Sequence, residues 1–560
     1  MQKLFLLFST AILALSAGAQ TTTFESATEA IAHMGVGWNL GNTLDASDGN
    51  ACPDIVKSET MWGQPVTKAQ LMTMMRDAGF GAIRVPVTWY PHMDESGRVD
   101  EAWMQRVHEV VDYVLEAGLY CLLNVHHDTG AGNGRWLIAN TDTYNDKRSR
   151  YENLWRQIAE EFKDYGERLL FESYNEMLDK YDSWCFATFA SPNKYDAAGA
   201  ADAYQAINSY AQSFVDVVRQ TGGNNATRNL VVNTYGACSG GGTWNSHLKD
   251  PLKEMKLPSD PAGTEHLAFQ VHSYPNVNNL TSMRSEMDDM FKALDSNLAS
   301  KGAPVIIGEW GTANDGETDY EVRRDNVMSF VDYFISKAKE YKMGTFWWMG
   351  LSDGPMRSLP AFSQPDLAER IVKAYHGNSI NPIFPTINDV DYEFSITYES
   401  LWGEANLYDQ SLQTSQYKGI RVELPNKPSG NLQVKVYGQS DGKEQYVPLN
   451  AATTTVNFNA STLGTTIRRI TLQYTDEPPF TTTVKRATLI KADGTEQSTM
   501  LNKFWGCTVS LNSTSTDIPT IKANANSFNQ GIYNLQGQKV TEMKRGIYIR
   551  NGKKIVVTRE

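Results

Sequence analysis

The octapeptide Pro-Val-Ile-Ile-Gly-Glu-Trp-Gly at residues 304–311 is the stretch from which the fold can be worked out. It opens with an apolar run, which is typical of a strand buried on both faces. The run stops at Glu309, and burying an acid without partners is costly. Two interpretations are open: a strand that runs out into a solvated loop, or a functional carboxylate at the mouth of a parallel sheet. The rest of the chain decides between them.

Seven similar apolar runs precede or follow this stretch, and helical patterns fill most of the gaps between them. The eight predicted strands are Gly35–Leu40, Ala82–Val87, Tyr120–Val125, Leu169–Tyr174, Leu230–Thr234, Leu267–Val271, Val305–Ile307 and Gly344–Trp348. One helix is expected to begin at a capping box opened by Thr67, and another to cover Asp100–Ala117. The alternation predicts an α/β fold, a (β/α)8 TIM barrel over residues 30–378. The alternative is an open doubly wound sheet, but no glycine fingerprint follows the first strand.

Composition narrows the class of partner. The 560 residues carry a formal net charge of -13, which argues against nucleic acid or an anionic membrane as a partner. Aromatic residues are plentiful, with 13 Trp and 26 Tyr, and such side chains suit flat ligands such as sugar rings. Ordinary core packing accounts for most of them.

The chain begins with a predicted secretory signal at residues 1–19. Lys3 supplies the positive start, residues 4–15 the apolar centre, and small residues up to Ala19 the cleavage site. The apolar run is too short to span a membrane, so we predict a secreted or cell-surface protein.

The odd number of cysteines leaves at least one free thiol, and one disulfide among three of the cysteines stays open. The three are Cys52, Cys185 and Cys238.

The alternation of strand and helix patterns ends after residue 380, at a proline-containing linker over residues 381–385. Residues 388–510 are rich in Val, Thr, Tyr and Gly, and their alternating runs predict a β-sandwich, with one strand at Thr483–Ile490. A Ser/Thr/Asn-rich linker leads to a small final β unit at residues 528–560. Whether the sandwich binds carbohydrate stays open. Its candidate binding residues are Trp402, Tyr408 and Tyr417, for each of which core packing is the simpler interpretation.

Polar or aromatic groups follow almost every predicted barrel strand. In a (β/α)8 barrel the carboxyl ends of the strands form one mouth, where chemistry occurs. We therefore expect these groups to converge: Asn42, Asp45, Arg84, His126, His127, Asn175, Glu176, Asn233, Tyr235, His272, Tyr274, Glu309, Trp347 and Trp348.

Glu176 and Glu309 are the glutamates that directly follow barrel strands, the fourth and the seventh. Two carboxyls about 5–5.5 Å apart are what a retaining glycoside hydrolase needs, one as acid/base and one as nucleophile. We expect Arg84 to keep Glu309 ionised, and the neighbouring carboxylate to raise the pKa of Glu176 above that of Glu309.

The remaining groups suit supporting roles around this pair. Asn175 can donate to a sugar 2-hydroxyl, and Tyr274 can donate to the nucleophile. His272 can tune the acid/base, His126 and His127 can bind sugar hydroxyls, and Trp348 can stack on a pyranose ring. The His-His pair has no third ligand at metal-site spacing, so we predict no metal and no cofactor.

These motifs, in this order, resemble the catalytic domain of glycoside hydrolase family 5, the cellulase family. The resemblance covers residues 30–378 and implies Glu176 as acid/base and Glu309 as nucleophile. It implies that Arg84, His126, Asn175, His272, Tyr274 and Trp348 surround the cleaved bond, and that Asn42 and Asp45 lie toward the non-reducing side. It rests on Gly37–Asp45, Ile83–Pro86, Asn124–Asp128, Tyr174–Glu176, His272–Tyr274, Ile307–Trp310 and Phe346–Trp348.

Two departures leave the polysaccharide undecided. Trp348 is followed by Met349, where many relatives have an acidic residue, and a long loop at residues 179–195 carries Trp184 and Phe186. The expected function is a secreted endo-β-1,4-glucanase acting on cellulose or a related β-glucan. The alternatives are a mannanase, xyloglucanase or lichenase, a carbohydrate-binding protein on an inactive barrel, or an adhesin using the β domains.

The two C-terminal units carry weaker resemblances. The sandwich resembles the jelly-roll modules of secreted polysaccharidases. The final unit, with strands at 531–535 and 546–550, resembles the sorting domains of exported Bacteroidetes proteins. The second resemblance implies surface display or release, with the secretion machinery as a possible partner.

Overall fold

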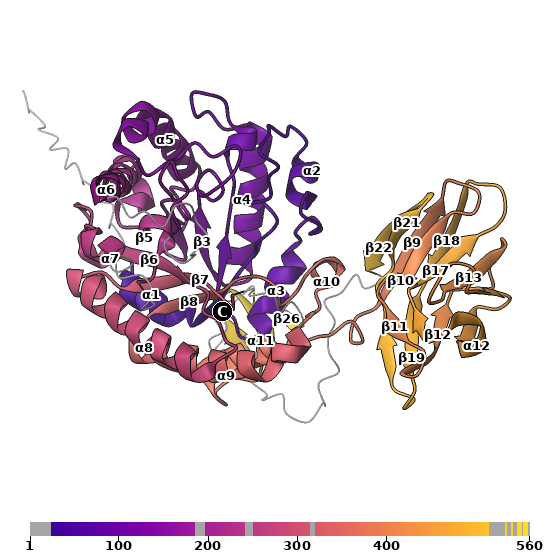
Figure 1. The fold of residues 1–560 in the computed structure, drawn as a ribbon. Helices are drawn as coiled ribbons and strands as arrows, with labels where there is room; N and C mark the ends of the chain where they lie inside the picture. The colour runs from indigo at the N-terminus through magenta and orange to yellow at the C-terminus, as the bar shows by residue number, and fades with distance from the viewer. Residues whose placement is uncertain are drawn as a thin grey trace, which may run out of the picture.

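The computed structural model describes residues 24–184, 197–240, 250–313 and 320–513, together with four short strands near the C-terminus. The first part is a closed barrel of eight parallel strands in the order β1 to β8, surrounded by helices (Figure 1). All eight predicted barrel strands are confirmed, and the doubly wound alternative is wrong because β1 pairs with β8 and closes the sheet.

Each barrel strand is short, and a helix packs outside most of them. The strands are β1 (Val36–Asn39), β2 (Ala82–Val85), β3 (Tyr120–Asn124), β4 (Leu169–Glu172), β5 (Leu230–Asn233), β6 (Leu267–Ser273), β7 (Val305–Trp310) and β8 (Gly344–Trp347). The helices are α1 (Ala27–Met34), α2 (Ile55–Thr60), α3 (Ala69–Asp77), α4 (Glu101–Glu116), α5 (Thr141–Glu161), α6 (Ala197–Gln220), α7 (Asp250–Glu254), α8 (Leu280–Asn297), α9 (Tyr320–Glu340), α10 (Pro355–Ser358) and α11 (Pro365–His376).

The barrel interior is apolar near the strand starts and polar near the strand ends. A cluster of small and aliphatic side chains, including Leu122, Leu170 and Ile306, packs against α1. Residues two positions further along a strand point to the same face. That step replaces Leu122 by Asn124 and Leu170 by Glu172, both fully buried. The period-two pattern of the strands therefore builds a polar layer directly on an apolar one.

Strand β7 continues to Trp310, so the prediction that it ends at Ile307 is wrong. Its register against β6 shifts: Val271 pairs with Ile307, but His272 pairs with Glu309, which leaves Gly308 as the extra residue of a bulge. A Cβ at Gly308 would lie 1.8 Å from Gln270 Nε2, so only glycine fits. Bulges re-aim side chains beside active sites, and this one turns Glu309 toward the barrel mouth.

The predicted capping box at Thr67 is also wrong. Helix α3 has Lys68 at its N-cap, without a side-chain cap. Thr67 is instead held by its backbone, whose N–H donates to Glu59 and whose carbonyl accepts from Arg106. Helix α4 follows its prediction and begins after Asp100, whose side chain accepts from two backbone N–H groups of the first turn.

Beyond the barrel lies a β-sandwich. A five-stranded sheet in the order β14-β13-β17-β10-β21 packs its apolar face toward the sheets β15-β12-β19-β20 and β18-β9-β22, and β11 pairs with β16. The strands are β9 (Tyr392–Tyr398), β10 (Glu404–Tyr408), β11 (Leu412–Gln413), β12 (Tyr417–Glu423), β13 (Leu432–Tyr437), β14 (Glu444–Pro448), β15 (Thr453–Asn457), β16 (Thr466–Ile467), β17 (Arg469–Tyr474), β18 (Phe480–Val484), β19 (Arg486–Lys491), β20 (Glu496–Ser498), β21 (Asn502–Trp505) and β22 (Cys507–Ser513). A short helix, α12 (Ala460–Leu463), lies between β15 and β16.

One predicted sandwich strand is two. The run Thr483–Ile490 is divided between β18 and β19, which belong to different sheets. The sandwich is joined to the barrel by packing as well as by the chain, since Leu359 and Ala361 after α10 are buried in the sandwich core. Near the C-terminus, β23 (Ile532–Asn534), β24 (Lys539–Val540), β25 (Gly546–Arg550) and β26 (Lys553–Val557) form an antiparallel sheet.

The predicted signal and Cys185 lie outside the described residues. Cys52, Cys121 and Cys507 are buried free thiols, which excludes Cys52 from the disulfide left open by the sequence. Within the described part of the chain, no helix is both long and apolar enough to cross a membrane.

Candidate active site

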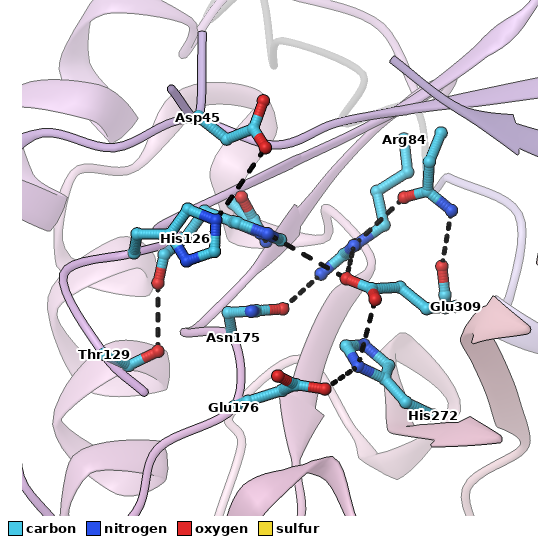
Figure 2. A network of polar contacts seen from close by, with 12 residues as sticks. Asp45, Arg84, His126, Thr129, Asn175, Glu176, His272 and Glu309 are labelled. Atoms are coloured by element: carbon cyan, nitrogen blue, oxygen red, sulfur yellow. Dashed lines mark hydrogen bonds and ion pairs between the residues drawn. The ribbon is translucent and has the colours of Figure 1, made fainter. Parts of the chain in front are cut away.

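Arg84 on β2 is the centre of the polar layer at the barrel mouth. Its side chain is fully buried, and each of its guanidinium nitrogens donates to a residue on or just after β4 or β7, two strands that are not adjacent to β2. Nη1 donates to Glu309 Oε1 at 2.8 Å, and Nη2 donates to Asn175 Oδ1 at 2.8 Å (Figure 2). The planar fork of an arginine fixes both partners at once, so it orients β4 and β7 relative to each other.

Glu172, the last residue of β4, is a buried member of this network that the sequence analysis missed. It accepts from Arg84 Nε at 2.7 Å and Nη2 at 2.8 Å. Asn124 and Asn233 donate to the same carboxylate at 3.1 and 3.2 Å. The signal was a glutamate inside an otherwise apolar strand run. Glu172 pairs with Nε and Nη2 of Arg84 and balances its charge. The remaining nitrogen, Nη1, donates to Glu309.

Glu176 and Glu309 come together as predicted, with His272 of β6 between them. One carboxylate oxygen of each glutamate and one ring nitrogen of His272 all lie within 4.8 Å of one another. His272 Nδ1 lies 2.8 Å from Glu176 Oε1 and 3.5 Å from Glu309 Oε2 (Figure 2). The distance between the two carboxyls is therefore closer to the ~5–5.5 Å of a retaining pair than to the ~6.5–9.5 Å of an inverting pair. The wider spacing of an inverting pair leaves room for a water molecule between the carboxyl and the sugar.

The surroundings of the two carboxyls give them different proton affinities. Burial raises the pKa of Glu176 to about 8, and the Arg84 charge opposes this only in part. Burial raises the pKa of Glu309 as well, but His272, Arg84 and the hydroxyl of Tyr274 all oppose it. Glu309 holds two direct donors to its charged form and therefore ionises first.

The predicted causes of these shifts need correction. At Glu176 burial is the main cause, rather than the neighbouring carboxylate. At Glu309 the influence of Arg84 is present as expected, yet the net shift of the pKa is upward. Burial also lowers the pKa of His272 to about 4, so the ring between the carboxyls is neutral at pH 7.

Tyr274 and Asn175 complete the surroundings of the pair. Tyr274 donates its hydroxyl to Glu309 Oε2 at 2.6 Å, so each oxygen of Glu309 accepts one strong hydrogen bond. Arg84 engages the oxygen of the Asn175 amide. That leaves the amide N–H groups as the donors that Asn175 offers to a ligand.

His126 and Trp348 form one wall of the site. The two rings are stacked, with centroids 5.8 Å apart and planes 5° apart. Asn124 Nδ2 donates to His126 Nδ1 at 3.0 Å, which leaves Nε2 of the neutral ring as the donor, 3.9 Å from Glu309 Oε1. Trp348 is half-buried, whereas Trp347 is buried in the core against Trp310. Trp348 is thus the tryptophan of the two that a ligand can reach.

Asn42, Asp45 and His127 lie at the edge of the site. Asp45 is fully buried, and its two oxygens accept from the backbone N–H groups of Asn42 and Thr43. His127 is partly exposed, with Nε2 3.9 Å from Asp45 Oδ2. Asp45 thus shapes the loop and supports His127, and its direct contact with substrate stays a prediction, as does that of Asn42.

Trp62 is a second residue that the sequence analysis missed. It is 40% exposed, and its ring lies edge-on to His127 at 5.3 Å. The residue sits just after α2, far in sequence from any strand end, so strand-end position does not predict it. Trp184 of the predicted long loop is partly buried against the barrel core, and Phe186 lies outside the described residues. The other strand-end residues, Asn233 and Tyr235, are buried and hydrogen-bonded.

Two groups of side chains have the composition of a metal site among the residues described. One is Glu176, His272 and Glu309, and the other is Asp45, His126 and His127. In the first, Arg84 and Tyr274 occupy the oxygens of Glu309. In the second, backbone N–H groups occupy the oxygens of Asp45. Hydrogen bonding therefore accounts for both groups.

Comparisons with known proteins agree with this geometry. The family model described as Cellulase (glycosyl hydrolase family 5) matches residues 45–353. Endoglucanase A of Clostridium longisporum is 32% identical over 344 residues, which cover 59% of this chain and 60% of that protein. Endoglucanase B of Neocallimastix patriciarum is 32% identical over 380 residues, covering 63% of this chain and 73% of that protein.

Solved structures extend the match. A GH5-4 broad specificity endoglucanase from an uncultured bacterium is 56% identical, with a TM-score of 0.61, over 63% of this chain and 97% of that chain. A family 5 enzyme from Prevotella bryantii B14, solved with a xyloglucan tetradecasaccharide, is 41% identical, with a TM-score of 0.57, over 63% and 99% of the two chains.

Proposed function

Because the chain belongs to glycosyl hydrolase family 5, we propose that it is an endo-β-1,4-glucanase that cleaves β-glucan with retention of configuration. The observation that carries the proposal is the carboxyl pair of Glu176 and Glu309, bridged by His272 at the barrel mouth. One carboxyl is held protonated by burial, and the other is held by two donors.

The proposed mechanism gives each step to one residue. An oxygen of Glu309 attacks the anomeric carbon and forms a glycosyl ester, while the bond from that carbon to the leaving oxygen breaks. Glu176 gives its proton to that oxygen. The resulting Glu176 carboxylate then takes a proton from water, which attacks the same carbon and releases Glu309. The amide of Asn175 donates to the sugar hydroxyl nearest the reacting carbon.

The test is the stereochemistry and the dependence on both carboxyls. We expect proton NMR to detect the β-anomer first when a soluble β-glucan is cleaved, and Glu309→Gln to remove nearly all turnover while glucan binding remains. Initial formation of the α-anomer would refute retention. Full activity of Glu309→Gln would refute the mechanism. It would not support a carbohydrate-binding protein or an adhesin either, because the chain would still hydrolyse glucan.

Substrate range is part of the same proposal. Similar structures include a broad specificity endoglucanase, an enzyme bound to a xyloglucan oligosaccharide and a lichenase. We propose a β-1,4-linked glucan backbone as the common substrate, with xyloglucan, lichenan and mannan as the alternatives. Initial rates on carboxymethyl cellulose, lichenan, xyloglucan and glucomannan, at equal mass concentrations, rank them.

We also propose that the protein is exported and that its C-terminal unit contacts the secretion machinery. The first residues have the pattern of a signal with cleavage after Ala19, and the end of the chain has a sorting-like pattern over residues 528–560. N-terminal sequencing of the protein from the medium or cell surface should begin at Gln20. Retention of an uncleaved N-terminus inside the cell would refute export.

A further inference from the structure

The outer face of the five-stranded sheet β14-β13-β17-β10-β21 has an unusual composition. Alternate residues of its strands are apolar and enter the sandwich core, such as Val434 and Leu472. The intervening residues form rows across the opposite face, as the strand pairing shows. One row is Gln433, Gln473, Glu404 and Trp505, and the next is Tyr446, Lys435, Thr471, Asn406 and Asn502.

The centre of this face is a buried polar network outside the apolar core. Glu404, Asn406, Thr471 and Gln473 are each less than one-tenth exposed. Glu404 accepts from Tyr437, Thr471 and Gln473 at 2.7 to 2.8 Å, so the network is held rigidly. Asn406, 4% exposed, donates to Asn502, but its Oδ1 lacks a hydrogen-bond partner among the described residues. A buried acceptor without a partner is costly, and a donor from a bound ligand would satisfy it.

Exposed aromatic side chains stand on both edge strands of the same sheet. Tyr446 on β14 is 48% exposed, and Trp505 on β21 is 52% exposed. Four strand spacings separate the two edges, or about 19 Å. Next to Trp505, Phe504 is 38% exposed, with the Arg469 guanidinium 3.8 Å from its ring centre. Exposed aromatic rings therefore stand at both borders of the face, with the buried polar network between them.

The charges on this face balance. Glu404 and Glu444 are opposed by Lys435 and Arg469, and Lys435 lies 3.6 and 3.7 Å from the two carboxylates. A balanced face does not favour an anion or a cation as its ligand. Neutral amides and hydroxyls between apolar rings instead complement an uncharged polyhydroxyl chain, whose ring faces are apolar and whose edges hydrogen-bond.

We propose that this outer face binds a β-glucan chain at a site separate from the catalytic cleft. The identity of the sugar rests on the proposed function, whereas the site itself rests on the sheet. Tyr446 and Trp505 stack on sugar rings, and Asn406 accepts from a sugar hydroxyl. Of the residues expected from sequence, Tyr408 and Tyr417 are partly buried against the sandwich core. Trp402, 50% exposed, stands two residues before β10, one of the strands of the proposed face.

The test uses the full chain carrying Glu309→Gln, so that glucan stays intact. We measure the Kd for soluble mixed-linkage β-glucan by affinity electrophoresis, with and without Tyr446→Ala and Trp505→Ala together. We expect the Kd to rise roughly tenfold, about threefold for each ring removed. Tyr417→Ala, an aromatic on another sheet, is the control and should leave the Kd unchanged, with the Tm of every variant recorded to confirm folding.

Hydrolysis provides an independent readout. With Glu309 intact, the double variant should cleave a short cello-oligosaccharide at the unmodified rate, since such a ligand needs the cleft alone. A Kd unchanged within about twofold overturns the proposal, as does an altered monomer–dimer equilibrium without a change in Kd, which would make the face a contact between copies. Absence of hydrolysis by the unmodified chain would refute the proposed function without affecting the binding result.

Discussion

The burial of Glu176 leads to a quantitative prediction about activity at alkaline pH. The proton on Glu176 is needed for departure of the leaving group, and burial raises its pKa to about 8. Activity is therefore present below this pKa and is lost as pH rises through it. The protonated fraction falls from about nine in ten at pH 7 to about one in ten at pH 9, so kcat/KM should fall about tenfold.

The assay is kcat/KM on soluble mixed-linkage β-glucan between pH 5 and pH 10. An aryl cellobioside with a good leaving group is the comparison, because its departure needs little help from an acid. Its glycosylation rate should lack the alkaline limb, and so should that of Glu176→Gln. An alkaline midpoint below pH 6, or the same limb in Glu176→Gln, would refute the assignment. On the acid side, Glu309 must be ionised, and because burial raises its pKa, the acid-side loss of activity should occur at a higher pH than for an ordinary glutamate.

Three substitutions test the polar layer. Glu172→Gln breaks a buried ion pair with Arg84 and should lower the free energy of unfolding by about 3–5 kcal/mol in a denaturant titration. Gly308→Ala places a Cβ 1.8 Å from a neighbouring side chain, so overpacking of about 1–3 kcal/mol should lower kcat by displacing Glu309. Tyr274→Phe removes the 2.6 Å hydrogen bond to Glu309, so kcat/KM should fall roughly 10- to 100-fold, and the acid limb should move to higher pH.

Gly308→Ala and Glu172→Gln each have a matched comparison. Gly311→Ala adds the same methyl group one residue beyond Trp310, but its nearest atom is 3.4 Å away, so little change is expected. Glu160→Gln removes a carboxylate that pairs with Lys163 on the surface and should change stability by less than about 1 kcal/mol. Equal effects of Gly308→Ala and Gly311→Ala would contradict the role of the bulge. An acid limb unmoved by Tyr274→Phe would contradict the role of the hydroxyl.

The junction of the two larger units bears on any truncation experiment. Leu359 and Ala361 follow α10 of the barrel and are buried in the sandwich core. Removing residues 385–560 would expose this apolar surface, so we expect the deletion to destabilise the barrel for reasons unrelated to catalysis. Point substitutions on the outer sheet face separate the functions more cleanly than deletion.

The sequence by itself determined the barrel and most of the mouth. Eight apolar runs separated by helical patterns leave few ways to bury every strand, and a parallel closed sheet brings all carboxyl ends to one edge. Strand-end residues were therefore predicted to meet at the mouth, and Glu176, Glu309 and Arg84 do lie together there. These conclusions depend on the pattern of apolar and polar residues within each strand or helix, which can be read from that segment alone.

The tertiary structure decided which neighbours each group meets. The bulge at Gly308 depends on how β7 registers against β6, and the pairing of Arg84 with Glu172 depends on two strands that are not adjacent. The burial that raises the pKa of Glu176 likewise comes from the whole mouth. The polar face of the sandwich arises in the same way, from five strands brought together across about a hundred residues. Such properties come from lateral register and closure, because contacts between distant segments are absent from any local pattern.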